Sequence, residues 1–269
     1  MKKETKNRLL KEELTSLISK YSQTNVLEEL AKTHHKSPVQ MIKTELIMDN
    51  AFVRKVTLSP NKLAEFVDNY QRNILLEPLV VRAKDEKYEV IIGRKRLAAA
   101  KLAKISEIPV IVMNYNDEET LLILLAKARD SQRSNVLEFA YIFHNLNKKY
   151  GYLHENLAKM TYSSRTQVTN ILRLLKLPTE ILKALNNDEI SFGHARALVS
   201  LSNEEALEHL NLIITNKLSV RQLEAMISKP SKIAFKGQEH IVLQTKNKVT
   251  IVFSSEEEAK EFVAKSLKK

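Results

Sequence analysis

The segment that most constrains the fold lies at residues 152–177 and reads YLHENLAKMTYSSRTQVTNILRLLKL. Its pattern predicts two short helices joined by a tight turn. Apolar residues at helical spacing predict the buried face of the second helix, namely Val168, Ile171, Leu172 and Leu175. Ser163 or Ser164 can cap its first N–H groups, and Pro178 cannot continue its hydrogen-bond ladder. Both ends of this helix are therefore marked in the sequence.

The opposite face of the same helix carries donors and acceptors that suit contacts with DNA. These side chains are Arg165, Thr166, Gln167, Thr169, Asn170 and Arg173. Arg and Gln can form paired hydrogen bonds with guanine and adenine edges in the major groove, while Ser and Thr more often hold phosphate. The segment is thus typical of a helix-turn-helix that reads DNA, and an ordinary amphipathic helical hairpin is the alternative.

The charge of the chain favours a polyanionic partner. The 269 residues, enough for two or three domains, carry a formal net charge of +11 at pH 7. Charge alone does not separate DNA from RNA or from anionic lipid. Aromatic residues are only 6% and Trp is absent, which disfavours single-stranded nucleic acid, where bases stack on aromatic platforms. Double-stranded DNA is therefore the expected partner.

The absence of cysteine excludes disulfides, thiolate-ligated metal sites and cysteine nucleophiles. No apolar run approaches the ~18 residues that cross a bilayer, and the start of the chain lacks the apolar core of a secretory signal. We expect a cytoplasmic protein with no membrane partner.

The first half of the chain reads as a tail followed by an α+β domain. Residues 1–35 predict a basic tail with one amphipathic helix, whose apolar side holds Leu10, Leu14, Leu17, Ile18 and Tyr21. Residues 36–133 predict a mixed domain: strands at 77–83, 87–93 and 108–115 and a helix at 94–103. Asn116 and Glu119 form a capping box for a further helix that leads out of the domain.

The second half predicts an all-α domain and a small C-terminal module. Residues 134–227 predict successive helices with caps at Ser191, Ser202 and Ser219, two of them boxed by Glu205 and Gln222. Residues 228–239 follow neither the helical nor the strand periodicity of apolar residues, and they therefore predict a linker. Residues 240–269 predict two strands and a helix, a ββα module too small to be stable alone. Self-association is the expected remedy, through the helical stripe Ala259, Phe262, Val263 and Leu267.

Four segments, in this order, carry a resemblance to a known family. They are IIGRKRLAAAKLAKISEIPVIV at 91–112, NILRLLKLP at 170–178, ISFGHARALVSL at 190–201 and LSVRQLEAMI at 218–227. Together they resemble the ParB family of bacterial chromosome and plasmid partition proteins, from about residue 41 to the end. A lone helix-turn-helix is a weak signal, but four ordered matches are hard to obtain by chance.

The resemblance implies a homodimer that nucleates on a palindromic, centromere-like parS site. It also implies spreading on flanking DNA as a clamp gated by CTP, stimulation of a ParA-type ATPase by the N-terminal tail, and SMC condensin as a further partner. The DNA contacts that it implies are Ser163, Ser164, Arg165, Thr166, Gln167, Asn170 and Arg173, with Gly193, His194 and Arg196 as a second contact segment.

The first nucleotide motif implied by the resemblance is altered in this chain. The family usually has Gly-Glu-Arg-Arg-x-Arg, where this chain has Gly93, Arg94, Lys95 and Arg96 followed by Leu97 and Ala98. Gly93 after a strand, with Lys95 and Arg96 opening a helix, still makes a reasonable phosphate cradle. A solvated basic helix start is the alternative.

The second nucleotide motif departs further. The family's Glu-Asn-x-x-Arg corresponds to Arg129, Asp130, Ser131, Gln132 and Arg133. Arg129 places a cation where a carboxylate would hold Mg²⁺, so CTP hydrolysis is expected to be slow or absent. Asp130 and Arg133 complete the implied nucleotide contacts. Tyr162 replaces the usual turn glycine, so the turn must differ or hold a tyrosine at an unfavourable backbone angle.

Two alternatives stay open. The first domain could be a nucleotide-dependent enzyme, because kinases and sulfiredoxin-like proteins share the fold that the resemblance implies. Against this alternative, the sequence shows no well-placed acid–base pair for catalysis. The adjacent His34 and His35 lie in a polar stretch near the N-terminal tail. A nucleoid-occlusion factor would use the helix at 7–21 as a lipid anchor, but Glu12 and Glu13 on its polar face disfavour an anionic membrane.

Overall fold

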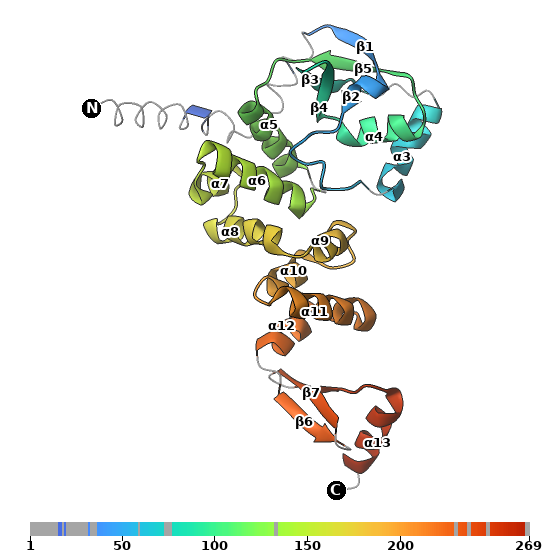
Figure 1. Ribbon diagram of the computed structural model, residues 1–269, viewed down its shortest axis with the longest axis vertical. Coiled ribbons are helices and arrows are strands. Elements are labelled where there is room, and N and C mark those ends of the chain that lie inside the picture. Colours follow the sequence, from blue (N-terminus) through green and yellow to red (C-terminus); the bar gives the residue numbers. More distant parts are fainter. Residues whose placement is uncertain are drawn as a thin grey trace, which may run out of the picture. The chain divides into compact units, whose positions relative to one another are not determined.

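The computed structural model divides the chain into two compact units, residues 1–175 and 176–269. Within them the structure describes residues 16–17, 19, 32, 37–58, 60–72, 77–131, 134–228, 231–235, 238–245 and 248–266 (Figure 1). The predicted N-terminal helix lies outside these residues apart from a few positions. The division at 175/176 falls inside the region predicted as one helical domain, so each unit is described separately.

The first unit is built on a five-stranded sheet with the order β1-β5-β3-β4-β2. Its strands are β1 (Val39–Lys43), β2 (Ile47–Met48), β3 (Leu79–Lys84), β4 (Lys87–Ile92) and β5 (Glu107–Val112). The hairpin of β3 and β4 is antiparallel, whereas β3 runs parallel to β5. Asp85 forms its turn with φ +53°, a backbone angle that aspartate tolerates better than most residues. The strands predicted around this turn are confirmed.

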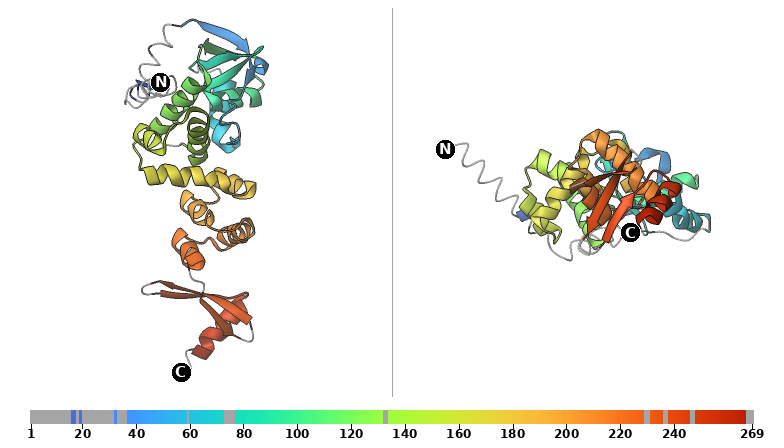
Figure 2. Two further views of the ribbon diagram at one scale, coloured as in Figure 1. Left: turned by 60° about the vertical axis from the view of Figure 1, so that its left-hand side comes forward. Right: turned by 90° about the horizontal axis from the view of Figure 1, so that it is seen from below.

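Helix α4 (Arg94–Leu102) packs on the sheet, and helix α3 (Pro60–Gln71) packs on α4 (Figure 2). Helix α4 connects β4 to β5 and contributes Leu97 and Ala100 to the core, which they share with Ile47, Val81 and Val110. These side chains are at most 2% exposed. The burial of branched side chains from sheet and helix is the main stabilising term of this unit.

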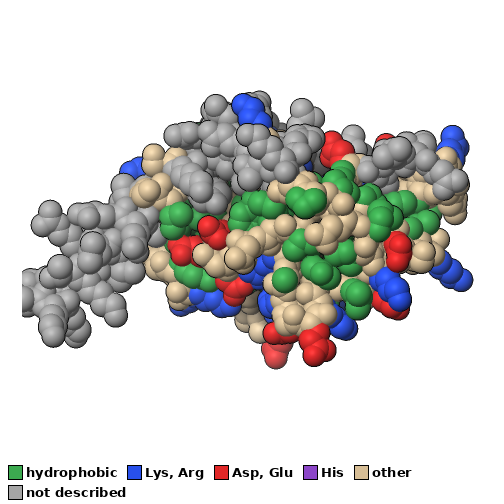
Figure 3. All heavy atoms as spheres, turned by 90° about the horizontal axis from the view of Figure 1, so that it is seen from above, with side chains coloured by type: hydrophobic (Ala, Val, Ile, Leu, Met, Phe, Trp, Pro, Cys, Tyr) green, Lys and Arg blue, Asp and Glu red, His purple; other side chains and the backbone are tan. Residues whose placement is uncertain are grey.

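Strand β1 forms one edge of the sheet and leaves apolar side chains exposed. Val39 is 54% and Met41 59% exposed. Figure 3 shows hydrophobic side chains gathered on the face seen from above. The strand is only five residues long and ends at the exposed Lys43, two features that limit edge-to-edge pairing.

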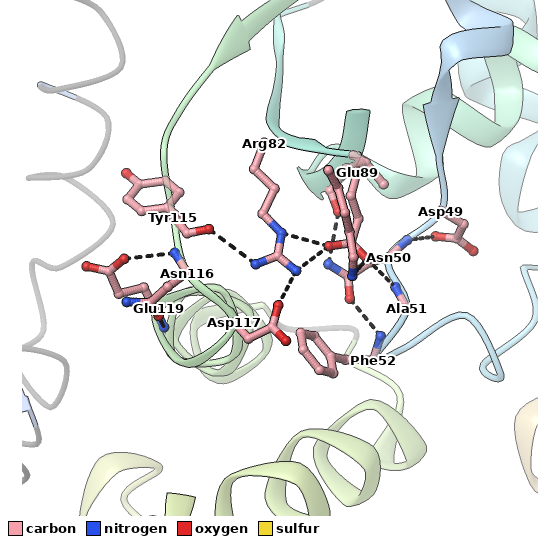
Figure 4. A network of polar contacts seen from close by, with 12 residues as sticks. Asp49, Asn50, Ala51, Phe52, Arg82, Glu89, Tyr115, Asn116, Asp117 and Glu119 are labelled. Carbon is pink, nitrogen blue, oxygen red and sulfur yellow. Dashed lines mark hydrogen bonds and ion pairs between the residues drawn. The ribbon is translucent and has the colours of Figure 1, made fainter. Parts of the chain in front are cut away.

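A buried network of charges joins the sheet to helix α5 (Asp117–Asp130) (Figure 4). Arg82 on β3 lies 2.6 Å from Glu89 on β4 and 2.5 Å from Asp117, the first residue of α5. Its Nη1 also donates to the Tyr115 carbonyl at 3.2 Å. Burial acts to lower the pKa of Arg82, but the bonds to Asp117 and Glu89 outweigh it and raise the pKa. The start of α5 is therefore fixed to the sheet by ion pairs.

Helix α5 leads from the sheet into a helical part of the same unit. The predicted capping box is confirmed, because the Asn116 side chain accepts from the Glu119 N–H and the Glu119 carboxylate accepts from the Asn116 N–H. Helix α6 (Val136–Tyr150) packs on α5 and ends at Gly151 with φ +72°. Tyr152 is fully buried and donates from its hydroxyl to Glu118 at 3.0 Å.

The second unit begins with four α-helices, which are followed by a small sheet and a last helix. The helices are α9 (Thr179–Asn186), α10 (Phe192–Leu198), α11 (Asn203–Asn216) and α12 (Val220–Ser228). The caps predicted at Ser191, Ser202 and Ser219 are confirmed, since each hydroxyl accepts from the N–H three residues on. A capping residue lies within three positions of the N–H group that it binds, so a short stretch of sequence is enough to predict it.

The C-terminal module has one strand more than predicted. An antiparallel sheet β6-β7-β8 precedes helix α13 (Glu256–Ser266). Its strands are β6 (Ser231–Phe235), β7 (Gln238–Thr245) and β8 (Lys248–Val252). The predicted linker at 228–239 is wrong at this point, because 231–235 pairs with 238–242 in register. Pro230 and Gly237 border the new strand and do not interrupt it.

Candidate nucleic-acid interface

The predicted helix-turn-helix is present in the first unit as α7 (His154–Met160) and α8 (Arg165–Arg173). Helix α8 buries Val168 and Ile171, which are at most 5% exposed. Of the two serines considered as its cap, Ser164 performs the role and accepts from the Gln167 N–H at 3.0 Å. Ser163 instead shares a hydrogen bond of 2.8 Å with the Thr161 hydroxyl.

The buried face of this helix differs from the prediction at its end. The α-helix stops at Arg173 and continues as a 3₁₀ turn, η2 (Leu174–Lys176). A 3₁₀ turn has about three residues per turn instead of about 3.6. The buried side chain is therefore that of Leu174, one residue earlier than the predicted Leu175. Leu174 is fully buried, whereas Leu172 and Leu175 are only half-buried.

The face of α8 that points to solvent is basic and polar. Arg165, Thr166, Gln167 and Arg173 are exposed, and Asn170 is half-buried. No acidic residue lies on α8. Both side chains best suited to base edges, Arg165 and Gln167, lie in the first turn of α8 and are open to solvent.

Thr169, which the periodicity places on the same face, is occupied inside the motif. Its hydroxyl donates to the Arg165 carbonyl at 2.9 Å and lies 2.9 Å from His154 Nδ1. Since a hydroxyl has one hydrogen, His154 Nδ1 is the donor to Thr169. This contact ties the first residue of α7 to the middle of α8 and fixes the angle between the two helices.

The second predicted contact segment is the start of α10 in the second unit. A Cβ at Gly193 would lie 2.8 Å from a methyl group of Val220, so glycine lets α10 approach α12 closely. His194 accepts the Ser191 N–H at its Nδ1, 3.2 Å away, and completes a capping box. Arg196 is 46% exposed and pairs with Glu224 at 2.8 Å. All three residues stabilise the local structure, and their contact with DNA stays a prediction.

The first nucleotide motif is largely occupied by protein partners. Arg94 makes two bonds to Asp49, of 2.7 and 2.9 Å, and one of 2.6 Å to the Val56 carbonyl. Arg96 donates to the Glu77 carbonyl, and burial lowers its pKa. Lys95 is exposed. A Cβ at Gly93, which has φ +101°, would lie 2.3 Å from Leu79, so this glycine is required by packing.

The second motif holds no free carboxylate. Arg129 binds Asp130 through Nε at 2.6 Å and Nη2 at 3.1 Å. Arg133 lies outside the described residues. Across the part of the chain that the structure describes, no three His, Cys, Asp or Glu side chains come together in a way that could hold a metal ion. The side chains around this motif therefore do not fit Mg²⁺, while the start of α4 with Lys95 fits an anion.

The predicted dimerisation stripe divides into two kinds of residue. Phe262 packs inside the module, with its ring 5.1 Å from that of Phe253, which in turn lies 4.6 Å from His240. Val263 is 52% exposed, and Ala259 is half-buried. Leu267 lies outside the described residues. Since no residue of α13 is fully buried, the helix keeps apolar surface available.

The described residues include no helix with the length and apolar character needed to cross a membrane.

Tyr162, at the turn between α7 and α8, has φ +51°. The expectation that this turn holds a tyrosine at an unfavourable backbone angle is therefore confirmed. No pattern near Tyr162 signals what stabilises this turn, because the contact with its ring comes from a distant helix.

Comparisons with known proteins match both parts of this architecture. The model of the ParB N-terminal domain matches residues 28–128, and that of the ParB HTH domain matches residues 132–232. A probable chromosome-partitioning protein ParB of Rickettsia prowazekii (strain Madrid E) is 35% identical over 198 residues, which cover 74% of this chain and 68% of that protein.

Two similar solved structures are of the C-terminally truncated chromosome-partitioning protein ParB from Caulobacter crescentus. One, complexed to the centromeric parS site, is 27% identical, covers 70% of this chain and 98% of that chain, and has a TM-score of 0.42. The other, complexed with CTP-γ-S, is also 27% identical, covers 65% of this chain and 99% of that chain, and has a TM-score of 0.31.

Proposed function

This chain belongs to the ParB family of chromosome-partitioning proteins, and we propose that it binds a palindromic parS-like DNA site through helix α8. The observation that carries the proposal is the division of α8 into two faces. One face is buried at Val168 and Ile171, and the other presents Arg165 and Gln167 to solvent. A helix held in this way can enter the major groove with its first turn against the bases.

A palindromic site requires two copies of the chain, and the C-terminal module supplies the proposed contact between them. Val249 on β8 is 58% exposed and Val263 on α13 is 52% exposed. A module of about 40 residues gains stability when such side chains are covered by a partner. Dimerisation would also bring two α8 helices to one site, which raises affinity without any new contact to DNA.

For the nucleotide, we propose binding without hydrolysis. The start of α4 and the exposed Lys95 would hold phosphate groups of CTP, because free N–H groups and a cation favour anions. When bound, CTP would serve as the switch of a clamp that spreads on flanking DNA. The side chains of Asp130 and Arg129 neutralise each other, so this chain lacks a carboxylate for Mg²⁺ at the expected place.

The remaining partners follow from family membership. We propose that residues 1–35 contact a ParA-type ATPase, that SMC condensin is a further partner, and that the protein associates with the nucleoid. The tail lies almost entirely outside the described residues, so its support is its basic sequence.

In vitro selection tests the proposed DNA binding. The full-length protein is incubated with a pool of random duplexes, and bound duplexes are amplified and sequenced over several rounds. A palindromic motif with two half-sites is expected to dominate the selected pool. A pool that stays random would contradict the proposal, and so would enrichment of a single half-site by a protein that sediments as a dimer.

A further inference from the structure

Arg129, at the end of α5, contacts the turn of the helix-turn-helix. Its side chain is 4% exposed, and its Nη1 donates to the carbonyl of Met160, the last residue of α7, at 3.2 Å. The final carbonyl groups of a helix lack partners within the helix. Arg129 therefore caps the C-terminus of α7 from a different element of the fold.

The same guanidinium lies over the ring of Tyr162, with a distance of 5.3 Å to the ring centroid. Tyr162 has φ +51°, a left-handed conformation that is unfavourable for a residue with a Cβ. An arginine over an aromatic face within about 6 Å is attracted by the ring. The stacked pair thus offsets part of the strain in the turn.

Asp130 fixes the orientation of the guanidinium. Its two carboxylate oxygens lie 2.6 Å from Nε and 3.1 Å from Nη2 of Arg129. The bond to Asp130 is the largest contribution that raises the pKa of Arg129, and burial acts in the opposite direction. Because two parallel bonds hold a planar group rigidly, the third nitrogen points at Met160 and the flat face lies on Tyr162.

We propose that Arg129 and Tyr162 act as a positioning pair, which holds the turn so that α8 presents Arg165 and Gln167 to DNA at the correct angle. This inference rests on the proposed DNA binding. Arg129 does not touch DNA itself, since its side chain is almost fully buried. The two residues are 33 positions apart in the chain, and each departs from the pattern expected at its own place.

Two hydrogen bonds on either side of Tyr162 join the turn to α7 itself. The Thr161 hydroxyl donates to the Leu157 carbonyl at 2.8 Å, and the Ser163 N–H donates to the Ala158 carbonyl at 3.0 Å. Ser164, two residues after Tyr162, is the cap of α8. A change of backbone angle at Tyr162 therefore tilts the start of α8, where paired contacts with bases tolerate errors of only about 0.5 Å.

The test compares Arg129→Gln, Tyr162→Gly and the double variant with the wild type. Arg72→Gln is the matched control, because it removes one positive charge from an exposed side chain directly after α3. Affinity is measured for the duplex selected by the wild type and for a random duplex of the same length. Arg129→Gln should bind the selected duplex about tenfold more weakly and the random duplex equally well, as expected for lost geometry of base contacts. Tyr162→Gly in that background should restore most of the loss, because glycine needs no support in the left-handed region.

Two results would overturn the inference. Equal losses on both duplexes, or no loss per folded molecule, would mean that Arg129 only stabilises the fold. Losses that simply multiply in the double variant would mean that Arg129 and Tyr162 do not act as a pair.

Hydrogen exchange separates this inference from the DNA-binding proposal. If the wild type selects no duplex, the proposed function fails, but the amides of residues 160–167 still report on the turn. They should exchange faster in Arg129→Gln than in the wild type or Arg72→Gln, and the double variant should return them toward the wild-type rate. Unchanged exchange in Arg129→Gln would refute the positioning role directly.

Discussion

The Ser164 hydroxyl accepts the backbone N–H of Gln167 at 3.0 Å, and so fixes the point at which the recognition helix α8 begins. Arg165 and Gln167 follow this cap within the first turn and are both exposed. Their place, more than their number, makes this helix suited to reading DNA, because the N-terminal residues of a recognition helix contact base edges.

The first prediction is that Arg165 and Gln167 read bases. Substituting either with Ala should cost ~1 to 3 kcal/mol against the specific site and relax discrimination at one position in each half-site. Lys148→Ala, an exposed cation on α6, is the control and should have little effect. Gel shifts measure the affinity of each variant for the specific and for a random duplex. Equal losses of affinity on both would mean that Arg165 and Gln167 contact phosphates and do not read bases.

The second prediction is that the exposed stripe of α13 holds the dimer. Val263→Asp should give monomers that keep the fold of the module, because Val263 is 52% exposed and a charge buried in a contact is unfavourable. Phe262→Asp should instead unfold the module, since Phe262 packs on Phe253. Sedimentation of each variant at micromolar concentration tests this, with Lys260→Ala as the control. A Val263→Asp protein that remains a dimer would disprove the assignment.

The third prediction concerns Glu89, whose side chain is 2% exposed and accepts from Arg82 and the Ala51 N–H. Glu89→Gln leaves Asp117 as the one charged partner of Arg82 among the residues that the structure describes. Breaking a buried ion pair in this way costs about 3 to 5 kcal/mol. Urea denaturation should show this loss in the free energy of unfolding, and a loss below about 1 kcal/mol would mean that the network is not a main support of α5.

The fourth prediction is a pH dependence at Glu138. Burial raises the pKa of this carboxyl, against the opposing effects of Arg94 and Lys95. A raised pKa in the folded state means that the charged form is disfavoured, so stability is lost as the pH rises through that pKa. Glu138→Gln should therefore be neutral at low pH, where both states are protonated, and stabilising at neutral pH. Thermal unfolding across pH 4 to 8, with Glu65→Gln as an exposed control, checks the sign. A variant less stable at pH 7 would show that the pair with Arg94 dominates.

The fifth prediction is that CTP binds without turnover. Calorimetry with each nucleoside triphosphate, with and without the selected duplex, should detect CTP, and Lys95→Ala should weaken it by removing a charge-assisted contact. Arg96→Ala is a poorer probe, because Arg96 donates to the Glu77 carbonyl. Phosphate release should stay at background, since Asp130 is held by Arg129. Brisk hydrolysis stimulated by DNA would contradict this prediction.

Much of this arrangement could be predicted from the sequence, because the signals are local. The caps at Asn116, Ser191 and Ser202 depend on residues three positions apart, and the strand alternation depends on near neighbours. The periodicity predicted for α8 failed at its C-terminal end, where a 3₁₀ turn buries Leu174 in place of the predicted Leu172 and Leu175. Strand β6 was missed because its flanking Pro230 and Gly237 resemble a linker.

The contacts that could not be predicted join distant segments. Arg94 and Asp49 are 45 positions apart, and nothing near either residue signals the other. The same holds for Arg129 and Tyr162, which are unusual separately and compensate each other only in the folded chain. Residue patterns reveal departures from a family motif, while the structure reveals what those departures contact.

Chromatin immunoprecipitation in the native host tests the central claim most directly. The protein should cross-link to DNA in peaks centred on a palindromic site, with signal that declines over the flanking DNA. A chromosomal Arg165→Ala, Gln167→Ala variant should lose the peaks while its abundance is unchanged. Uniform coverage by the wild type, or peaks that persist unchanged in the variant, would contradict the assignment of α8 as the element that reads DNA.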